Sequence, residues 1–259
     1  MRAKKSLGQN FLTSKAVAGD IIKAADLSSH DTVLEIGPGK GFLTEELLKK
    51  TRKVIVVEKD TRLIEYLQEK FAEEVMAKKL EIIHDDILDF DFAQCNLKSK
   101  HYTLVANIPY YITGQILRMF LENAAQPKKM ILMVQKEVAQ RIVARDNKES
   151  ILSISVKAYG VPHYVKKVPE RYFKPQPKVD SAILLIDGIS KRLFQNKKAE
   201  EKFFKLVKTG FAHKRKILSN NLSSYANAEE MFTRCKIPQK IRAEKLSIED
   251  WTCLVEHIQ

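Results

Sequence analysis

Cysteine is scarce in this sequence, which contains only Cys95, Cys235 and Cys253. They lie far apart and no CxxC pair occurs, so their spacing predicts neither a disulfide framework nor a zinc site. We expect reduced thiols, buried or idle, and no metal. Long apolar runs are also missing, since none approaches the ~18 residues of a membrane span and no apolar signal core follows the charged start. We therefore expect a cytoplasmic protein.

Acidic residues are outnumbered, with 32 Asp and Glu against 45 Lys and Arg and a net charge of +13. Residues 1–15 carry +4 and residues 190–259 carry +7, which leaves +2 for the residues between them. A basic excess can simply keep a surface solvated. Its concentration in two segments around a near-neutral body favours a polyanionic partner, most simply nucleic acid.

Strand-like and helix-like patterns alternate between Thr32 and Gln135. Runs rich in β-branched residues predict strands at 32–36, 53–58, 80–84, 103–107 and 129–135, and apolar residues three or four apart predict helices between them. This alternation implies parallel strands joined by crossover helices, with ligands gathered at the carboxyl ends of the strands. We predict a doubly wound, Rossmann-like α/β domain.

The remainder of the chain changes character twice. Residues 151–160 are ambiguous between helix and strand, and residues 163–187 indicate a strand, a proline-rich loop and a strand that complete the sheet. From Lys191 only helix patterns occur. We predict a domain 1–189, whose residues 1–15 form a basic arm, and a small all-helical domain 190–259.

A glycine-rich turn joins the first predicted strand to its helix. Gly37, Gly39 and Gly41 permit a tight turn and let the backbone approach a ligand at the helix amino end. A dinucleotide fingerprint would have a glycine where Phe42 stands, which argues against NAD. Glu58 ends the second strand, where a carboxylate can accept hydrogen bonds from both hydroxyls of a ribose.

Polar side chains also follow the third and fourth strands. Asp85 or Asp86 can accept a hydrogen bond from an exocyclic amine, and "NIPYYITG" begins with Asn107. Taken singly, a strand-end acid or an Asn-x-Pro turn is ordinary structure. Because parallel strands end at one edge of the sheet, we expect these groups to share one crevice with the glycine turn.

These residues resemble the S-adenosylmethionine-dependent methyltransferases, and most closely the adenine dimethyltransferases of ribosomal RNA. The matching motifs cover nearly the whole chain, in order "SLGQNFLTS", "VLEIGPGKG", "VVEKD", "HDDIL", "NIPYYIT", "QKEVAQRI", "VPERYFKPQPKVDSAIL" and "FFKLVKTGFAHKRKILSNNL". The resemblance implies S-adenosyl-L-methionine as the cofactor. Its contacts would fall on Asn10, Leu12, Gly37, Gly39, Glu58, Asp86 and Asn107.

The fourth strand end is where we expect the chemistry. An adenine amine becomes tetrahedral and cationic on methylation, so acceptors aimed at its hydrogens favour the transition state without a general base. Asn107 supplies one acceptor, and the resemblance suggests the main-chain carbonyl of Ile108 as the second. Pro109 would stiffen the turn. Tyr110 offers a stacking face for a flipped adenine, and the resemblance puts Phe173 on its other face.

Two branches of this family share most of these motifs, and the last third of the chain resembles the small-subunit branch. That branch dimethylates N6 of two adjacent adenosines in a 3′-terminal hairpin loop of small-subunit ribosomal RNA, here within an immature subunit. We expect a monomer. The alternatives are a large-subunit enzyme of the macrolide-resistance type and a non-catalytic assembly factor. Departures from the family pattern are Tyr111, the pair Gly114–Gln115 and a short loop at 144–150.

RNA contacts are expected at both basic ends. The apolar residues of 203–211 have helical spacing and are expected to form core, whereas "HKRK" is less easily explained by solubility. The predicted RNA-binding residues are Arg2, Lys4, Lys5, Lys214, Arg215 and Lys216. They would grip folded RNA by shape and phosphate charge.

Overall fold

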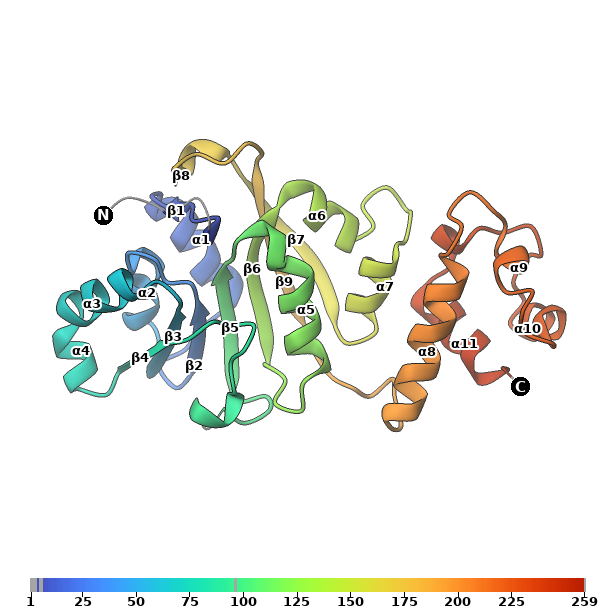
Figure 1. Ribbon diagram of the computed structural model, residues 1–259, viewed down its shortest axis with the longest axis horizontal. Helices are drawn as coiled ribbons and strands as arrows, with labels where there is room; N and C mark the ends of the chain where they lie inside the picture. Colours follow the sequence, from blue (N-terminus) through green and yellow to red (C-terminus); the bar gives the residue numbers. More distant parts are fainter. Residues whose placement is uncertain (1–3, 5–6, 96, 259) are drawn as a thin grey trace. The chain divides into compact units, whose positions relative to one another are not determined.

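The computed structural model describes residues 4, 7–95 and 97–258 (Figure 1). The chain forms two compact units: the first extends to Ala139 and includes Pro162–Ile189, and the second comprises Gln140–Val161 and Ser190–Gln259. The predicted domains 1–189 and 190–259 differ from these units by the segment 140–161. That segment belongs to the second unit although its sequence precedes the last strands of the sheet.

The first unit contains a seven-stranded sheet in the order β4-β3-β2-β5-β6-β9-β7. Five strands are parallel: β2 (Thr32–Ile36), β3 (Lys53–Glu58), β4 (Leu80–His84), β5 (Tyr102–Asn107) and β6 (Lys129–Gln135). β9 (Ser181–Asp187) pairs with β6 in antiparallel register, and β7 (Val161–Val168) lies beyond it. The predicted α/β sheet is confirmed, with β5 beginning one residue earlier.

Crossover helices connect β2 to β3, β3 to β4 and β5 to β6, whereas the connection from β4 to β5 contains the short 3₁₀ helix η2 (Phe92–Cys95) (Figure 1). The crossover helices are α2 (Phe42–Leu48), α3 (Thr61–Lys70) with α4 (Ala72–Met76), and α5 (Thr113–Glu122), and α1 (Lys15–Ala25) precedes the sheet. Ser14 caps α1 by accepting from Val17 N, and Asp60 caps α3 by accepting from Arg62 N. Between β3 and β4, where the sequence predicts helical structure, the helix is broken into α3 and α4 at Phe71, which is buried.

Both faces of the sheet are apolar, as parallel sheets require. Val33, Val105 and Ile131 pack with α1 and α2 in one core cluster. Because side chains alternate along a strand, Leu34 and Leu104 face the opposite side, and they are fully buried too. The interior of the sheet is therefore largely apolar, although Glu35 of β2 and Thr103 of β5 are buried in it.

The second unit is helical. It contains α7 (Ile151–Lys157), α8 (Lys197–Gly210), α9 (Leu218–Asn221), α10 (Ala228–Arg234) and α11 (Ile248–Glu256), with α6 (Lys136–Ile142) crossing the boundary between the units. The ambiguous segment forms α7 because Ser150 and Ser153 make a reciprocal capping box. The predicted apolar stripe of α8 is core: Phe203 and Phe211 are buried, and Phe211 stacks on Trp251 with ring centroids 5.7 Å apart.

The cysteines depart in part from expectation. Cys95 is a free, buried thiol, as predicted. Cys235 and Cys253 form a disulfide, so the expectation of three reduced thiols was wrong for this pair. α10 and α11 bring the two residues together across a sequence separation of 18, which no local spacing signals. None of the helices in the described part of the chain is both long and apolar enough to span a membrane.

Candidate functional site

A cavity of about 960 Å³ lies in the first unit, where the parallel strands end. It is lined by the glycine turn after β2, by the end of β3, by the segment after β4, by the end of β5 and by residues of the amino-terminal arm. The volume falls in the range usual for small-molecule sites, roughly 300–1,000 Å³. The topology therefore brings together the strand ends that the sequence predicted would form one crevice.

The glycine turn forms one wall of the cavity. Gly37, Gly39 and Gly41 all have left-handed backbone conformations, with φ of 65°, 59° and 70°. A Cβ at Gly39 would lie 2.8 Å from the Phe11 ring, and one at Gly41 would lie 2.4 Å from the Phe71 ring. Two of these positions thus have no room for a side chain, and the third, Gly37, faces the main-chain oxygen of Asn107 across an open gap.

Glu58 is buried beside this turn. Its carboxylate accepts hydrogen bonds from Gly39 N at 3.3 Å and from Lys59 N and Asp60 N at 2.9 Å. Burial raises its pKa, although these three backbone donors act in the opposite direction. Glu58 is therefore an acceptor in the cavity wall and also a support for the glycine turn, a second role that its sequence position did not reveal.

Both candidate acids after β4 line the cavity. Asp85 accepts from Asp86 N at 2.8 Å, so it shapes the loop. Asp86 accepts from Leu88 N at 3.1 Å and forms an ion pair with Lys59. Burial acts to raise the pKa of Asp86, but the bonds from Lys59 and Leu88 N lower it overall. Asp86 is thus kept ionised. An exocyclic amine that bound here would compete with Lys59 for the Asp86 carboxylate.

Asn107 ends β5 with its side chain at the cavity. Its Nδ2 donates to the main-chain oxygen of Asn10 at 3.0 Å. Because an amide has its donor and acceptor on different atoms, this bond assigns Nδ2 to the arm and leaves Oδ1 as the acceptor. The acceptor role of Asn107 stays a prediction, with which this bond to the arm is compatible.

The rest of "NIPYYITG" divides between the cavity and the core. Pro109 lines the cavity, and Ile108 is buried. Tyr110 Oη lies 2.6 Å from Ser181 Oγ, and burial raises the pKa of this phenol. Tyr110 is not among the lining residues, whereas Tyr111 is, with 69% of its surface exposed. Tyr111 lies close to Gly8 of the arm, a neighbour that the sequence did not suggest.

The arm is fastened at two points. β1 (Phe11–Leu12) pairs with β8 (Phe173–Lys174) in antiparallel register, which puts Leu12 opposite Phe173. Asp60 accepts from Lys4 Nζ and Gln9 Nε2, each at 3.1 Å, and also binds Arg62. The hydrogen bonds from Arg62, Gln9 and Lys4 outweigh burial and hold the pKa of Asp60 well below its usual range.

Several residues with a predicted role in binding the base or RNA lie away from the cavity or have another partner. Phe173 is 4% exposed, belongs to the core cluster and does not line the cavity, although Lys174 and Pro175 do. Lys4 is bound to Asp60, whereas Lys214, Arg215 and Lys216 are exposed in the turn after α8. Arg2 and Lys5 lie outside the described residues. The base-stacking and RNA-binding roles of these residues remain predictions.

Sequence reasoning missed two acids of this site. Asp60 anchors the arm, and its only sequence signal is that of a helix cap before α3. Glu35 lies on β2, lines the cavity and accepts from Thr44 Oγ1 at 2.7 Å. Burial raises the pKa of Glu35 to about 8, so this carboxyl is protonated at neutral pH. An acid inside an apolar strand was the available signal.

The cavity fits the cofactor that the sequence motifs imply. Its wall contains an acid at the end of β3 and an acid after β4, which suit ribose hydroxyls and an exocyclic amine, and Asn107 lies in the same wall. The gap beside Gly37 exists because this residue has no side chain. S-adenosylmethionine would thus lie between Glu58, Asp86 and Asn107.

Comparison with known proteins gives consistent results. The family described as "Ribosomal RNA adenine dimethylase" matches residues 1–259. A relative named ribosomal RNA small subunit methyltransferase A, from Dehalococcoides mccartyi, is 44% identical over 98% of this chain and 89% of its own. One of the same name from Clostridium botulinum is 40% identical over 95% and 90%.

Two solved structures have the same fold throughout. The 23S rRNA methyltransferase ErmE is 28% identical, with a TM-score of 0.79 over 96% of this chain and 99% of its own. A dimethyladenosine transferase from Plasmodium falciparum is 27% identical, with a TM-score of 0.79 over 94% and 95%. The likeness extends over both units of the chain.

Proposed function

The chain belongs to the ribosomal RNA adenine dimethylase family, whose members use S-adenosylmethionine, and from this premise we propose that it dimethylates small-subunit ribosomal RNA. The products would be two adjacent N6,N6-dimethyladenosines in a 3′-terminal hairpin loop. The observation that carries the proposal is that Asn107 lines the cavity and donates from Nδ2 to the arm, so that Oδ1 is left as an acceptor. Both curated relatives are named small-subunit methyltransferases, which favours small-subunit over large-subunit ribosomal RNA as the substrate.

Hydrogen bonds that accept from the adenine amine would stabilise the transition state of methyl transfer. S-adenosylmethionine, when bound, supplies a methyl group activated by its positive sulfur. The adenine amine must give up conjugation with its ring, and Asn107 Oδ1 and the Ile108 carbonyl favour that change by binding its two hydrogens. The methyl group would pass from sulfur to nitrogen, with S-adenosylhomocysteine as the other product. The nitrogen is then cationic and acidic and would lose its proton to water, so no basic side chain is needed.

The target base must leave its stack before it can reach these acceptors. Tyr110 would stack on one face of the flipped base, a contact of about 1–3 kcal/mol. Its hydroxyl lies 2.6 Å from Ser181 Oγ. Neither Tyr110 nor Phe173 lines the cavity in this conformation, so both rings would have to become accessible to the base, and Phe173 would have to leave its buried position.

A labelling experiment tests the function. The protein is incubated with methyl-labelled S-adenosylmethionine and either immature small subunits or large subunits, and modified adenines are mapped by mass spectrometry. We expect two adjacent dimethylated adenosines near the 3′ end of the small-subunit RNA. Label only in the large subunit would favour the resistance-type activity, to which the likeness to the 23S enzyme gives some support. No label in either RNA would favour a non-catalytic assembly factor.

The second unit is the proposed RNA grip. Lys214, Arg215 and Lys216 are exposed in the turn between α8 and α9, and Asn221 Nδ2 holds that turn by donating to Gly210 O at 2.6 Å. A fixed turn presents cations to phosphates at little entropic cost. We propose that a monomer binds an immature small subunit through this turn, in the cytoplasm where ribosomal subunits assemble.

Replacing Lys214, Arg215 and Lys216 by alanine together is expected to weaken RNA binding and reduce its salt dependence. Each lost phosphate contact lowers the slope of log K against log salt by about 0.7–0.9, so the slope should fall by about 2–3. Filter binding from low to moderate salt measures this. Alanines at Lys49, Lys50 and Arg52 remove the same charge from an exposed cluster between α2 and β3. An equal loss in both variants would contradict a specific role for the turn.

A further inference from the structure

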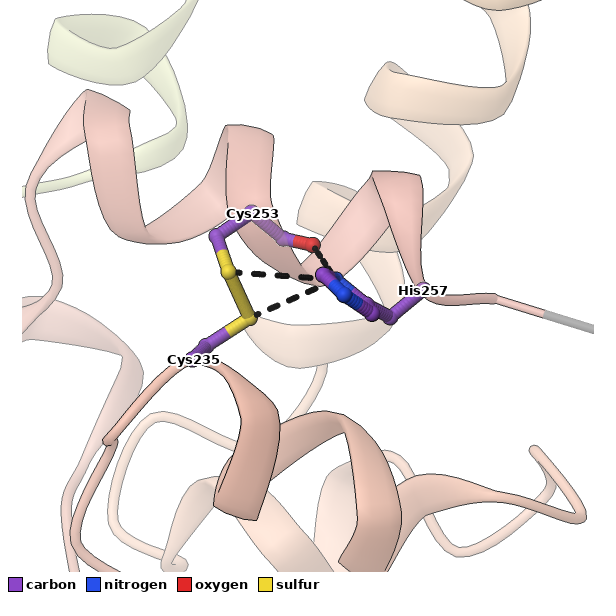
Figure 2. Close-up of side chains that lie close together, drawn as sticks. All are labelled: Cys235, Cys253 and His257. Atoms are coloured by element: carbon purple, nitrogen blue, oxygen red, sulfur yellow. Dashed lines mark hydrogen bonds between the residues drawn. A yellow bond between two sulfur atoms is a disulfide. The ribbon is translucent and has the colours of Figure 1, made fainter.

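The helical unit contains a cluster of metal-binding side chains that the proposed methyl transfer does not use (Figure 2). Cys235 follows α10, Cys253 lies on α11, and His257 is the first residue after α11. Potential ligand atoms of all three lie within 4.8 Å of one another. We propose that, once the disulfide is reduced, these residues bind one thiophilic divalent cation of the Zn²⁺ class.

The histidine already lies near the distance that a tetrahedral site requires. Zinc bonds of about 2.3 Å to sulfur and about 2.1 Å to nitrogen put a thiolate and an imidazole nitrogen about 3.6 Å apart. His257 Nδ1 is 3.9 Å from Cys235 Sγ and 3.9 Å from Cys253 Sγ. Two of the three edges of the ligand triangle are therefore within a few tenths of an ångström of coordination geometry.

The third edge depends on the oxidation state of the two sulfurs. In a tetrahedral site two thiolates lie about 3.8 Å apart. The Cα atoms of Cys235 and Cys253 are 5.8 Å apart, and rotation about the Cα–Cβ bonds of two separate thiols can reach that spacing without moving a helix. A disulfide offers no thiolate, so the oxidised and metal-bound states exclude each other.

The surroundings favour a cation. Cys253 lies on α11 and His257, the residue that caps α11, follows four residues later, a spacing that puts two ligands on the same side of a helix. The cluster lies at the carboxyl end of α11, where the helix dipole attracts positive charge. Asn227 Nδ2 donates to His257 O at 2.6 Å and so fixes the backbone of this ligand.

One contact must be exchanged on binding. His257 Nδ1 lies 2.9 Å from the main-chain oxygen of Cys253. To bind the cation, Nδ1 would give up this contact and the imidazole hydrogen would move to Nε2 through solvent, which leaves the imidazole neutral. All three side chains are partly exposed, which leaves a path for entry and a fourth coordination position for solvent. Reduction by a phosphine gives two thiols and a phosphine oxide, whose oxygen comes from water. Cation binding then releases one proton from each thiol.

Cobalt(II) titration of the full-length protein tests the site. After phosphine reduction in the absence of oxygen, we expect one equivalent of Co²⁺ to give thiolate-to-cobalt charge-transfer absorption, and Zn²⁺ to abolish it. The oxidised protein should give none. No charge-transfer absorption from the reduced protein would overturn the proposal, and this comparison requires no substitution and no methyltransferase activity.

Single substitutions assign the ligands. Cys235→Ser and Cys253→Ser should each lose the absorption, and His257→Ala should weaken cobalt binding at least about tenfold. Cys95→Ser is the matched control, because Cys95 is a buried thiol of the first unit, and it should bind cobalt as the unsubstituted chain does. Circular dichroism checks that each variant is folded. Absorption retained in a folded Cys235→Ser/Cys253→Ser double variant would also overturn the proposal.

Discussion

Replacement of Asn107 by alanine is expected to lower kcat for RNA methylation by about 10²–10³-fold, a loss of about 2.7–4 kcal/mol of transition-state stabilisation. The side chain binds the arm through Nδ2 and leaves Oδ1 for the amine, whose need for an acceptor grows as it becomes cationic. Cofactor affinity should change much less. Single-turnover kinetics with saturating cofactor and RNA, together with calorimetric titration of the cofactor, measure the two effects separately.

A matched control is Gln68→Ala, which removes an exposed amide of α3 that does not line the cavity. It should leave both kcat and cofactor affinity unchanged. Asn107→Asp is informative because it keeps an acceptor but loses the Nδ2 donor to Asn10 O, so it should also be slow. If Asn107→Ala weakened cofactor binding as much as it slowed turnover, the assignment of Oδ1 to the target amine would be wrong.

Replacement of Glu58 by alanine should have the opposite signature, with cofactor Kd raised about 10- to 100-fold and kcat at saturation largely retained. Lost hydrogen bonds to a charged acceptor cost about 1.5–3 kcal/mol. The variant should also unfold at a lower temperature, because the backbone N–H groups of Gly39, Lys59 and Asp60 lose their acceptor. Calorimetric titration and thermal unfolding measure the two effects.

Glu69→Ala serves as the control, because it removes an exposed carboxylate of α3 outside the cavity lining. The pH dependence gives a further check on Glu58. Burial raises its pKa above the usual value for glutamate, so cofactor affinity should decline as pH falls through that raised pKa and the carboxylate becomes protonated. An affinity that was insensitive to acid in the unsubstituted protein would mean that the ionised carboxylate does not hold the ribose.

Regular patterns predicted the sheet well because its strands are buried on both sides. β2, β3, β4 and β6 have the bounds expected from their apolar runs. The segment 151–160 was ambiguous because a short apolar run fits a strand as well as a buried helix, and the capping box of Ser150 decides for the helix. Two serines three residues apart also occur outside helices, so they indicate a cap only where a helix is already expected.

The cavity followed from topology, whereas side-chain partners did not. Gly37, Glu58, Asp86 and Asn107 line one cavity because parallel strands end at one edge of the sheet. The bond from Asn107 to the arm could not be predicted, since an irregular segment has no periodicity that fixes its path. The pairing of Cys235 with Cys253 could not be predicted either, because the tertiary packing of α10 and α11, and no local spacing, brings the two residues together.

The pairing of β1 with β8 suggests a link between the two proposed ligands. Leu12, a proposed cofactor contact, is opposite Phe173, a proposed base contact, in this small antiparallel sheet. If Phe173 moves to cover a flipped adenine, the strand that carries Leu12 loses or shifts its pairing partner, so the two binding events would be coupled. Such a coupling is reciprocal: bound cofactor would change the affinity for the adenine by the same factor by which the adenine changes the affinity for the cofactor.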